Sequence, residues 1–103
     1  MICRMWHGIT PLARADAYAS FLEHRAIPDY RSVPGNLSVA VLRRDETEVS
    51  HFLTVTYWES EESIHAFAGD DLLRARYYPE DRDFLEFEPK VQHFVVAAIE
   101  HAA

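Results

Sequence analysis

The chain has 103 residues, of which 49% are hydrophobic and 13% aromatic, and its net charge is −7. This length and composition fit one globular domain, which we expect over residues 1–103. The excess of acidic residues argues against nucleic acid or an anionic membrane surface as a partner. No apolar run approaches the roughly 20 residues that span a bilayer. The first ten residues lack a signal-peptide pattern and Cys3 is the only cysteine, so we expect a cytoplasmic chain without internal disulfides.

The first part of the chain predicts a strand followed by a helix. Residues 2–10 show the period-two alternation of a strand. Thr10 is expected to cap the helix, with Pro11 at its first position. We expect Pro28 to interrupt this helix and a short extra turn to run through Tyr30. The apolar side of the helix, with Tyr18 beside it, recurs at helical spacing: Leu12, Ala15, Ala19, Leu22 and Ala26.

The second part predicts a hairpin, a helix and a closing strand. Residues 37–44 and 49–59 are rich in β-branched and aromatic side chains, and a polar connection joins them as antiparallel strands. Ser60 is expected to cap the next helix and Gly69 to end it. Residues 90–99 predict the last strand. The order β-α-β-β-α-β is that of the ferredoxin-like α+β fold, in which two helices cover one face of a four-stranded antiparallel sheet.

Both faces of the predicted sheet carry apolar side chains. An antiparallel sheet with one face in water should alternate apolar and polar residues. The strand 49–59 does not, because apolar residues occur on both of its faces: Leu53, Val55 and Tyr57 on one, and Phe52 and Trp58, with Thr54, on the other. The two helices of one chain can cover only one face. We therefore predict a homodimer in which the second face packs against another copy.

The sequence holds no recognised metal or cofactor motif. Its six histidines do not combine with cysteines, acids or one another at a ligand spacing such as H-E-x-x-H. It also lacks a Gly-rich phosphate loop, a dinucleotide fingerprint and a nucleophile elbow around a serine. We therefore expect no metal site and no bound cofactor.

A pocket for a small apolar or aromatic ligand is expected between the sheet and its helices, closed by the segment 69–88. Ligand sites are mostly apolar, with a few convergent polar groups. Histidine is the natural proton acceptor near neutral pH, and a tyrosine or arginine can hold an oxyanion. We expect His93 to be the base, Tyr78 or Arg4 its oxyanion partner, and the pocket walls to include Trp6, Trp58, Phe67 and Tyr77.

Each of these residues also has a purely structural interpretation. Trp58 fits a core residue, and His93 fits a core histidine whose hydrogen bonds are satisfied. A buried Arg4 would need a carboxylate such as Glu88 or Asp81, because an unpaired buried charge is very costly. The two adjacent tyrosines point about 100° apart on a helix, so only one of them can face inward.

Three stretches carry a resemblance to a known family. They are "VTYWESEESIHAFAGDD", "ARYYPEDRDFLEFEP" and "PKVQHFVVA". With these stretches the chain resembles the antibiotic-biosynthesis-monooxygenase-like family of dimeric α+β barrels over essentially its whole length. The resemblance implies oxidation of electron-rich hydroxy-aromatics to quinones by molecular oxygen, without flavin, metal or haem. A base removes the phenolic proton, and the resulting anion passes an electron to oxygen.

The resemblance also implies roles for individual residues. Trp58 matches the tryptophan of the family's pocket, and Thr54 stands where the quinone-forming members carry an asparagine. The haem-degrading branch places a ligand histidine on the helix after the third strand. His65 lies on that helix, beside its inward stripe, and the first strand lacks the asparagine of that branch.

Three hypotheses about function therefore remain open. The leading one is a small dimeric enzyme that resembles the cofactor-independent monooxygenases and oxidises an aromatic or phenolic compound with oxygen. The second is a non-catalytic binding module for an apolar small molecule. The third is a haem-binding or haem-degrading relative.

Overall fold

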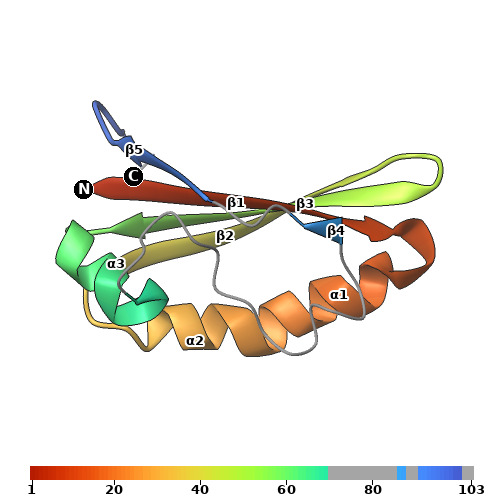
Figure 1. The fold of residues 1–103 in the computed structure, drawn as a ribbon, viewed down its shortest axis with the longest axis horizontal. Helices are drawn as coiled ribbons and strands as arrows, with labels where there is room; N and C mark the ends of the chain where they lie inside the picture. Colours follow the sequence, from red (N-terminus) through yellow and green to blue (C-terminus); the bar gives the residue numbers. More distant parts are fainter. Residues whose placement is uncertain (70–85, 88–90, 101–103) are drawn as a thin grey trace.

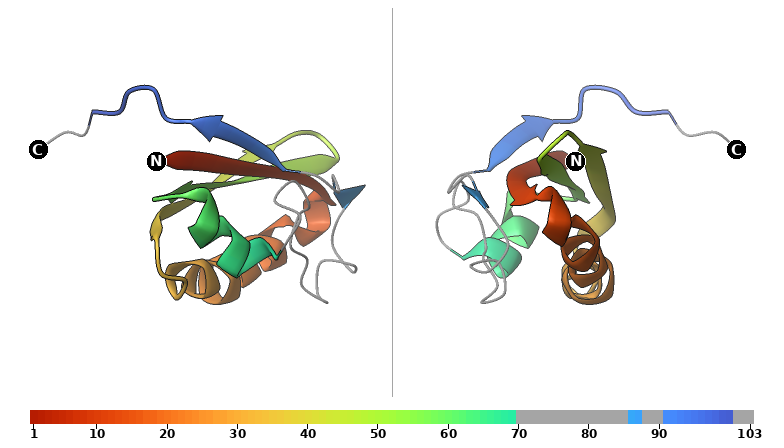
Figure 2. Two further views of the ribbon diagram at one scale, coloured as in Figure 1. Left: turned by 60° about the vertical axis from the view of Figure 1, so that its left-hand side comes forward. Right: turned by 90° about the vertical axis from the view of Figure 1, so that its right-hand side faces the viewer.

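The computed structural model describes residues 1–69, 86–87 and 91–100 of the chain. Figure 1 shows two layers, a twisted antiparallel sheet on one side and the helices on the other. The side views of Figure 2 show that all of these helices lie against the same face of the sheet. We call this face the inner face and the opposite one the outer face. This arrangement confirms the predicted ferredoxin-like α+β fold.

The sheet is organised around its first strand. β1 (Ile2–Pro11) pairs along its whole length with β3 (Val49–Trp58), and β3 pairs in turn with β2 (Asn36–Asp45), all antiparallel. The other edge of β1 pairs with two short strands, β5 (Gln92–Val95) near the N-terminus and β4 (Glu86–Phe87) further along. Both predicted hairpin strands are confirmed, each within one or two residues of its ends.

The pairing of β1 with β3 sets which side chains share a face. Trp6 pairs with Thr54 and Arg4 with Thr56, and these four side chains are buried on the inner face. The inner face of the two strands holds Arg4, Trp6, Gly8, Thr10, Ser50, Phe52, Thr54, Thr56 and Trp58. The outer face holds Cys3, Met5, His7, Ile9, His51, Leu53, Val55 and Tyr57. The predicted division of the third strand into two faces is therefore confirmed.

The first helical region is longer than predicted and starts differently. Thr10 is fully buried within β1 and does not cap a helix, since Pro11 ends the strand and precedes a 3-10 turn (Leu12–Arg14). α1 (Ala15–Phe21), a π turn (Leu22–Ala26) and α2 (Ile27–Arg31) follow without a break. The buried stripe consists of Ala15, Tyr18, Leu22, Ala26 and Tyr30. Tyr18 is thus central to the stripe, whereas the predicted member Leu12 is exposed.

Pro28 does not interrupt this helix, contrary to the prediction. The π turn lies directly before it, and the Ile27 N–H donates to the carbonyl of Leu22, five residues back. A proline ring inside a regular α-helix clashes with the carbonyl four residues earlier. A single wide turn displaces that carbonyl, so the helix passes through Pro28 and reaches Tyr30.

The helix after the third strand is confirmed in detail. α3 (Glu61–Ala68) begins after Ser60, whose hydroxyl accepts a hydrogen bond of 3.3 Å from the Ser63 N–H. Gly69 ends the helix with a φ of 83°, a conformation that glycine adopts without strain. The helix buries Ile64 and Phe67 against the sheet. No helix in the described part of the chain is long and apolar enough to cross a bilayer.

The C-terminal part departs from the prediction. The last strand ends at Val95 and not at residue 99, and β4 was not predicted. The Val96 N–H still donates to the Met1 carbonyl at 3.1 Å, after which the chain runs away from the sheet, as Figure 2 shows. The side chain of Val95 is 80% exposed and that of Ile99 45% exposed. These apolar residues therefore have little cover within the described chain.

Candidate functional site

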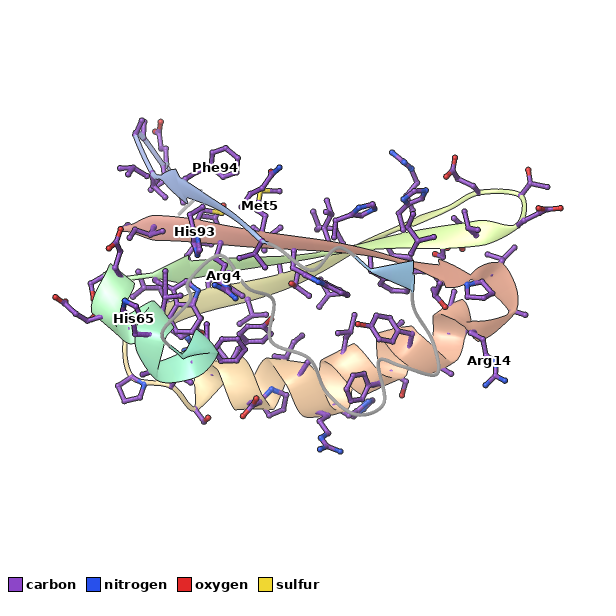
Figure 3. The ribbon with its side chains drawn as sticks, viewed as in Figure 1. Arg4, Met5, Arg14, His65, His93 and Phe94 are labelled. Carbon is purple, nitrogen blue, oxygen red and sulfur yellow. The ribbon has the colours of Figure 1, made fainter. Side chains whose placement is uncertain are left out.

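The inner face brings two predicted site residues together at one end of the sheet. Arg4 of β1 and His93 of β5 are register partners, and the Arg4 Nη1 lies 3.2 Å from the His93 Nε2. Figure 3 labels both side chains where these strands pair, close to α3. An arginine can only donate, so the Nε2 atom accepts. His93 is therefore the neutral imidazole whose proton is on Nδ1.

Burial and charge act together on this pair. Burial lowers the pKa of Arg4, whose side chain is 3% exposed, and the nearby Tyr30 opposes this shift. Burial also lowers the pKa of His93, the Arg4 charge lowers it further, and Glu61 opposes both. An arginine stays protonated in proteins even when its pKa is reduced. The pair at neutral pH is thus a guanidinium cation beside a neutral, basic imidazole.

Three aromatic rings from three elements meet next to this pair. Tyr30 of α2 stacks on Phe67 of α3, with ring centroids 4.3 Å apart and an interplanar angle of 21°. Trp58 of β3 completes the group at 5.7 Å from Phe67 and 6.5 Å from Tyr30. Tyr30 also acts on the buried Arg4 and raises its pKa. We call Tyr30, Trp58 and Phe67 the aromatic cluster.

Hydrogen bonds fix the aromatic cluster to the strand that carries Arg4. The Trp58 indole N–H donates to the Thr56 hydroxyl at 2.8 Å, and this hydroxyl donates to the Arg4 carbonyl at 3.2 Å. All three residues are buried. A buried network whose members are satisfied holds its side chains in one arrangement. Trp58 and Arg4 therefore keep a fixed relation across the two strands.

Trp6 and Thr54 form the neighbouring part of the inner face. They are register partners, with exposures of 9% and 4%. The ring of Trp6 lies over Gly8, where an added Cβ would come within 2.5 Å of the Trp6 Cη2. The structure thus gathers Arg4, Trp6, Thr54, Trp58, Phe67 and His93 on one side of the sheet, as the sequence predicted.

Other parts of the site were missed or lie elsewhere. The sequence prediction did not assign Tyr30, Thr56 or Glu61, although Tyr30 continues the helical stripe four residues after Ala26. The predicted Tyr77 and Tyr78 fall in residues 70–85, outside the described part of the chain. Glu88 and Asp81, the carboxylates that could pair with a buried Arg4, also lie outside the described part.

The described residues do not fit a haem ligand on α3. His65 is exposed, and its Nδ1 lies 2.9 Å from the Gly69 carbonyl at the end of the helix. The buried side of α3 consists of Ile64 and Phe67. Among residues 1–69 and 91–100, no group of three histidines, cysteines or acids could hold a metal ion.

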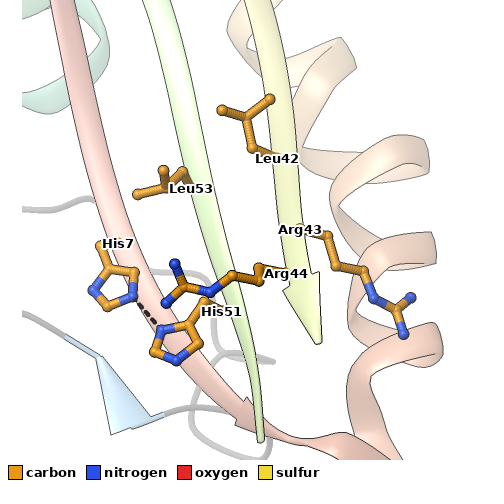
Figure 4. Close-up of a pocket in the computed structure, with 6 residues that line it drawn as sticks. All are labelled: His7, Leu42, Arg43, Arg44, His51 and Leu53. Atoms are coloured by element: carbon orange, nitrogen blue, oxygen red, sulfur yellow. Dashed lines mark hydrogen bonds between the residues drawn. The ribbon is translucent and has the colours of Figure 1, made fainter. Parts of the chain in front are cut away.

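A cavity that the sequence did not predict lies on the outer face. It has a volume of about 290 Å³ and is lined by His7, Leu42, Arg43, Arg44, His51 and Leu53 (Figure 4). The His7 Nε2 lies 2.9 Å from the His51 Nδ1, and the His51 Nε2 contacts the Glu46 carboxylate. With Glu46 ionised, each histidine donates from its Nε2, so a chain of hydrogen bonds runs from His7 through His51 to Glu46.

The fold and the inner-face site define a small α+β protein with an arginine, a histidine and aromatic side chains beneath an antiparallel sheet. The sequence pattern of the antibiotic biosynthesis monooxygenases matches residues 13–76. Because this match spans more than half of the chain, the protein belongs to that family. A comparison with curated protein sequences gives no match.

Solved structures share the fold at low sequence identity. MhuD from Mycobacterium tuberculosis, a haem degrader solved with two haems in its active site, is 23% identical with a TM-score of 0.67 (97% of this chain, 100% of that one). HapK from Hahella chejuensis is 17% identical with a TM-score of 0.68 (100% and 99%). A Bacillus cereus protein named provisionally as an antibiotic biosynthesis monooxygenase is 13% identical with a TM-score of 0.66 (98% and 97%). At these identities the likeness establishes the fold alone.

Proposed function

We propose that the protein is a small dimeric enzyme that oxidises a planar phenolic or anthrone-type compound with molecular oxygen, using its own side chains and no cofactor. The observation that carries this proposal is the contact between Arg4 and His93 at 3.2 Å beside the aromatic cluster. A neutral, half-buried imidazole supplies a base, and a buried guanidinium supplies a partner for an oxyanion. The aromatic cluster offers flat apolar surface to a flat ligand.

Substrate binding has to rearrange the Arg4–His93 hydrogen bond. In the ligand-free chain the Nε2 lone pair of His93 already accepts from Arg4, so it cannot also take a proton. A neutral acceptor oxygen of the substrate competes for the Arg4 guanidinium and releases the Nε2 atom. The imidazole then takes the substrate proton, and the oxyanion lies between the two resulting cations. Their mutual repulsion, which lowers the pKa of His93 in the free chain, is thereby offset.

The oxidation itself balances with oxygen as the only co-reactant. Loss of the proton gives an enolate or phenolate, which transfers one electron to O₂ and forms a substrate radical with superoxide. Their combination forms a C–O bond and a peroxide. Loss of water then gives the quinone and regenerates neutral His93. For an anthrone, the sum is one substrate plus one O₂ to one anthraquinone plus one water.

We propose further that the outer face is the dimer interface. Leu42 is 49% exposed and Phe94 is 51% exposed, and both lie on this face with Leu53 and Val55. The described helices all cover the opposite face (Figure 2). Exposed apolar side chains on a sheet face without helical cover are typical of a protein–protein contact. Packing two copies outer face to outer face would remove it from water and leave the helix-covered inner face of each copy outside the interface.

Oxygen uptake tests the enzymatic proposal. The purified protein is treated with a chelator and mixed with a panel of hydroquinones and anthrones in an oxygen electrode. We expect uptake with at least one planar member of the panel, and a rate lower by about 10² to 10⁴ in His93→Gln, because a general base contributes this much. Glutamine can still accept a hydrogen bond from Arg4. Equal rates in the two proteins would remove the role assigned to His93.

One observation favours a second function, that of a binding module without catalysis. The only described hydrogen bond of the His93 Nε2 uses the lone pair that a base needs. If a ligand leaves this bond intact, the site binds but does not react. The same experiment separates the two functions, because a binding module saturates with a planar phenol at one per site and consumes no oxygen.

A further inference from the structure

The two tryptophans of the chain lie on the same face of the sheet but differ in one respect. The Trp58 N–H donates to Thr56 at 2.8 Å. The Trp6 N–H is also buried, yet it has no hydrogen-bond partner among the described residues, and it is the one buried side-chain polar atom there of which this is true. A buried donor without a partner is destabilising, and native structures rarely keep one without a reason.

The local sequence holds the Trp6 ring in this position. Gly8 lies two residues further on the same face, and a Cβ there would come within 2.5 Å of the Trp6 Cη2 and 2.9 Å of its Cζ2. Any larger residue at position 8 would therefore push the ring aside. Glycine weakens a strand interior and often marks a close approach. The strand thus keeps a glycine where the indole ring needs the space.

We propose that the Trp6 N–H is a ligand-binding donor that receives an acceptor oxygen of the substrate, such as a carbonyl or phenolic oxygen. This inference rests on the proposed function and concerns the same site. An indole N–H can only donate, so it selects a hydrogen-bond acceptor such as an oxygen and not a donor-only group such as an ammonium cation. Trp6 is two residues along β1 from Arg4, at about 7 Å, a span that one planar ligand of two or three fused rings covers.

The Trp6 N–H is shielded from water, and this shielding makes it effective in recognising a ligand. Trp6 is 9% exposed and its register partner Thr54 is 4% exposed. A hydrogen bond made in such surroundings is stronger than one made in water. A site with a buried donor also rejects an analogue without the matching oxygen, because the donor then stays unpaired. We therefore assign to Trp6 a role in specificity, beyond that of an apolar wall.

The experiment replaces Trp6 with benzothienylalanine, which has the shape of tryptophan but a sulfur in place of the N–H. Binding is measured without oxygen for two probes, anthrone and 9,10-dihydroanthracene, which lacks the oxygen. We expect the replacement to weaken anthrone binding about tenfold and to leave dihydroanthracene binding unchanged. The same replacement at Trp58 is the matched control, because it removes a hydrogen bond within the protein and should lower the melting temperature, whereas the change at Trp6 should not.

A second measurement needs no substitution. The wild-type protein gives two indole N–H signals in a proton–nitrogen correlation spectrum, one for each tryptophan. Adding anthrone should move the Trp6 signal downfield as its N–H gains an acceptor, and by more than it moves the Trp58 signal, because the Trp58 N–H already donates to Thr56. If anthrone binds but neither the Trp6 signal nor the affinity of the Trp6 variant changes, the inference is wrong and the proposed function stands. If the wild type binds neither anthrone nor any other planar phenol, the proposed function fails and the inference with it.

Discussion

The two faces of the sheet are built from the same strands but from different chemistry. The inner face combines a cation, a histidine, hydroxyls and aromatic rings in buried contact, and the chain covers it with its own helices. The outer face combines aliphatic side chains with a hydrogen-bonded pair of histidines and has no helical cover in the described chain. Period-two alternation thus gives each strand one helix-covered face, which we propose as the ligand site, and one face without helical cover, which we propose as the surface for assembly.

This difference explains how the inner face can bury polar residues without destabilising the fold. A buried arginine, threonine or indole N–H destabilises a fold unless something pairs with it. Thr56 pairs with Trp58 and with the Arg4 backbone, and His93 accepts from Arg4. On the outer face the exposed residues include the apolar Leu42 and Phe94, which we propose that a second copy covers.

Removing the base should have the largest effect. His93→Gln keeps an acceptor for Arg4 but has no group that takes a proton, so the oxidation rate should fall by about 10² to 10⁴. The measurement is the initial rate of oxygen uptake under saturating substrate. His51→Gln, on the outer face, is the control and should leave the rate within about twofold. A loss of rate of similar size in both variants would contradict the assignment of the reaction to the inner face.

Removing one ring of the aromatic cluster should have the second-largest effect. Trp58 is fully buried, and Trp58→Ala should lower the free energy of unfolding by about 3 to 5 kcal/mol, because a large cavity and a lost hydrogen bond add together. Leu42→Ala on the outer face removes a half-exposed side chain and should cost about 1 kcal/mol or less. Urea unfolding at one protein concentration, below the dimer dissociation constant so that the proposed interface does not contribute, measures both values. Equal losses would mean that the outer face is as firmly packed as the inner one.

A charge on the outer face should separate the copies. Leu42→Asp should raise the dimer dissociation constant at least tenfold, because a carboxylate in an apolar contact is desolvated without a partner. Leu12→Asp makes the same change at an exposed leucine outside the sheet and should leave assembly unchanged. Sedimentation velocity over a range of concentrations measures both. A wild-type monomer at micromolar concentration would refute the assembly proposal outright.

The pH dependence should report the environment of His93. Burial and the Arg4 charge lower its pKa below the ordinary 6.5, so the basic form is present at pH 7 and above. The rate should fall about tenfold per unit once the pH drops below this lowered pKa. The unfolded chain protonates His93 at a higher pH than the folded chain, so stability is also lost as the pH falls from 6.5. Rates are therefore corrected for the folded fraction. A descending limb centred at or above pH 6.5 would contradict the assignment.

The smallest effect concerns the helix that carries Phe67. Ser60→Ala removes the side chain that accepts from the Ser63 N–H and should lower the free energy of unfolding by about 1 kcal/mol. Ser20→Ala, within α1 and on an exposed surface, is the control and should change it by about 0.5 kcal/mol or less. Thermal unfolding followed by circular dichroism resolves the two. A Ser60 variant as stable as the wild type would show that packing alone positions α3.

Strands, the capped helix and the inner-face residues of β1 and β3 could be predicted, because period-two alternation and capping are local signals. On this basis Thr54 and Trp58 were correctly predicted to lie on the inner face, and Phe67 on the side of its helix that packs against the sheet. The route of the helix through Pro28 could not be predicted, since the compensating π turn depends on the fit to the sheet. The contact of Arg4 with His93, 89 residues apart, and the packing of Tyr30 against Phe67 depend on tertiary structure. The early end of the last strand has no local signal.

The central claim is that the inner face carries out an oxygen-dependent oxidation with side chains alone. The most direct test measures quinone formed and oxygen consumed in the same solution, with anthrone and the chelator-treated wild-type protein. The account predicts one quinone per oxygen molecule, over many turnovers per protein chain, at a rate that falls with His93→Gln. Tight binding of anthrone with no oxygen consumed above the rate without protein would contradict it.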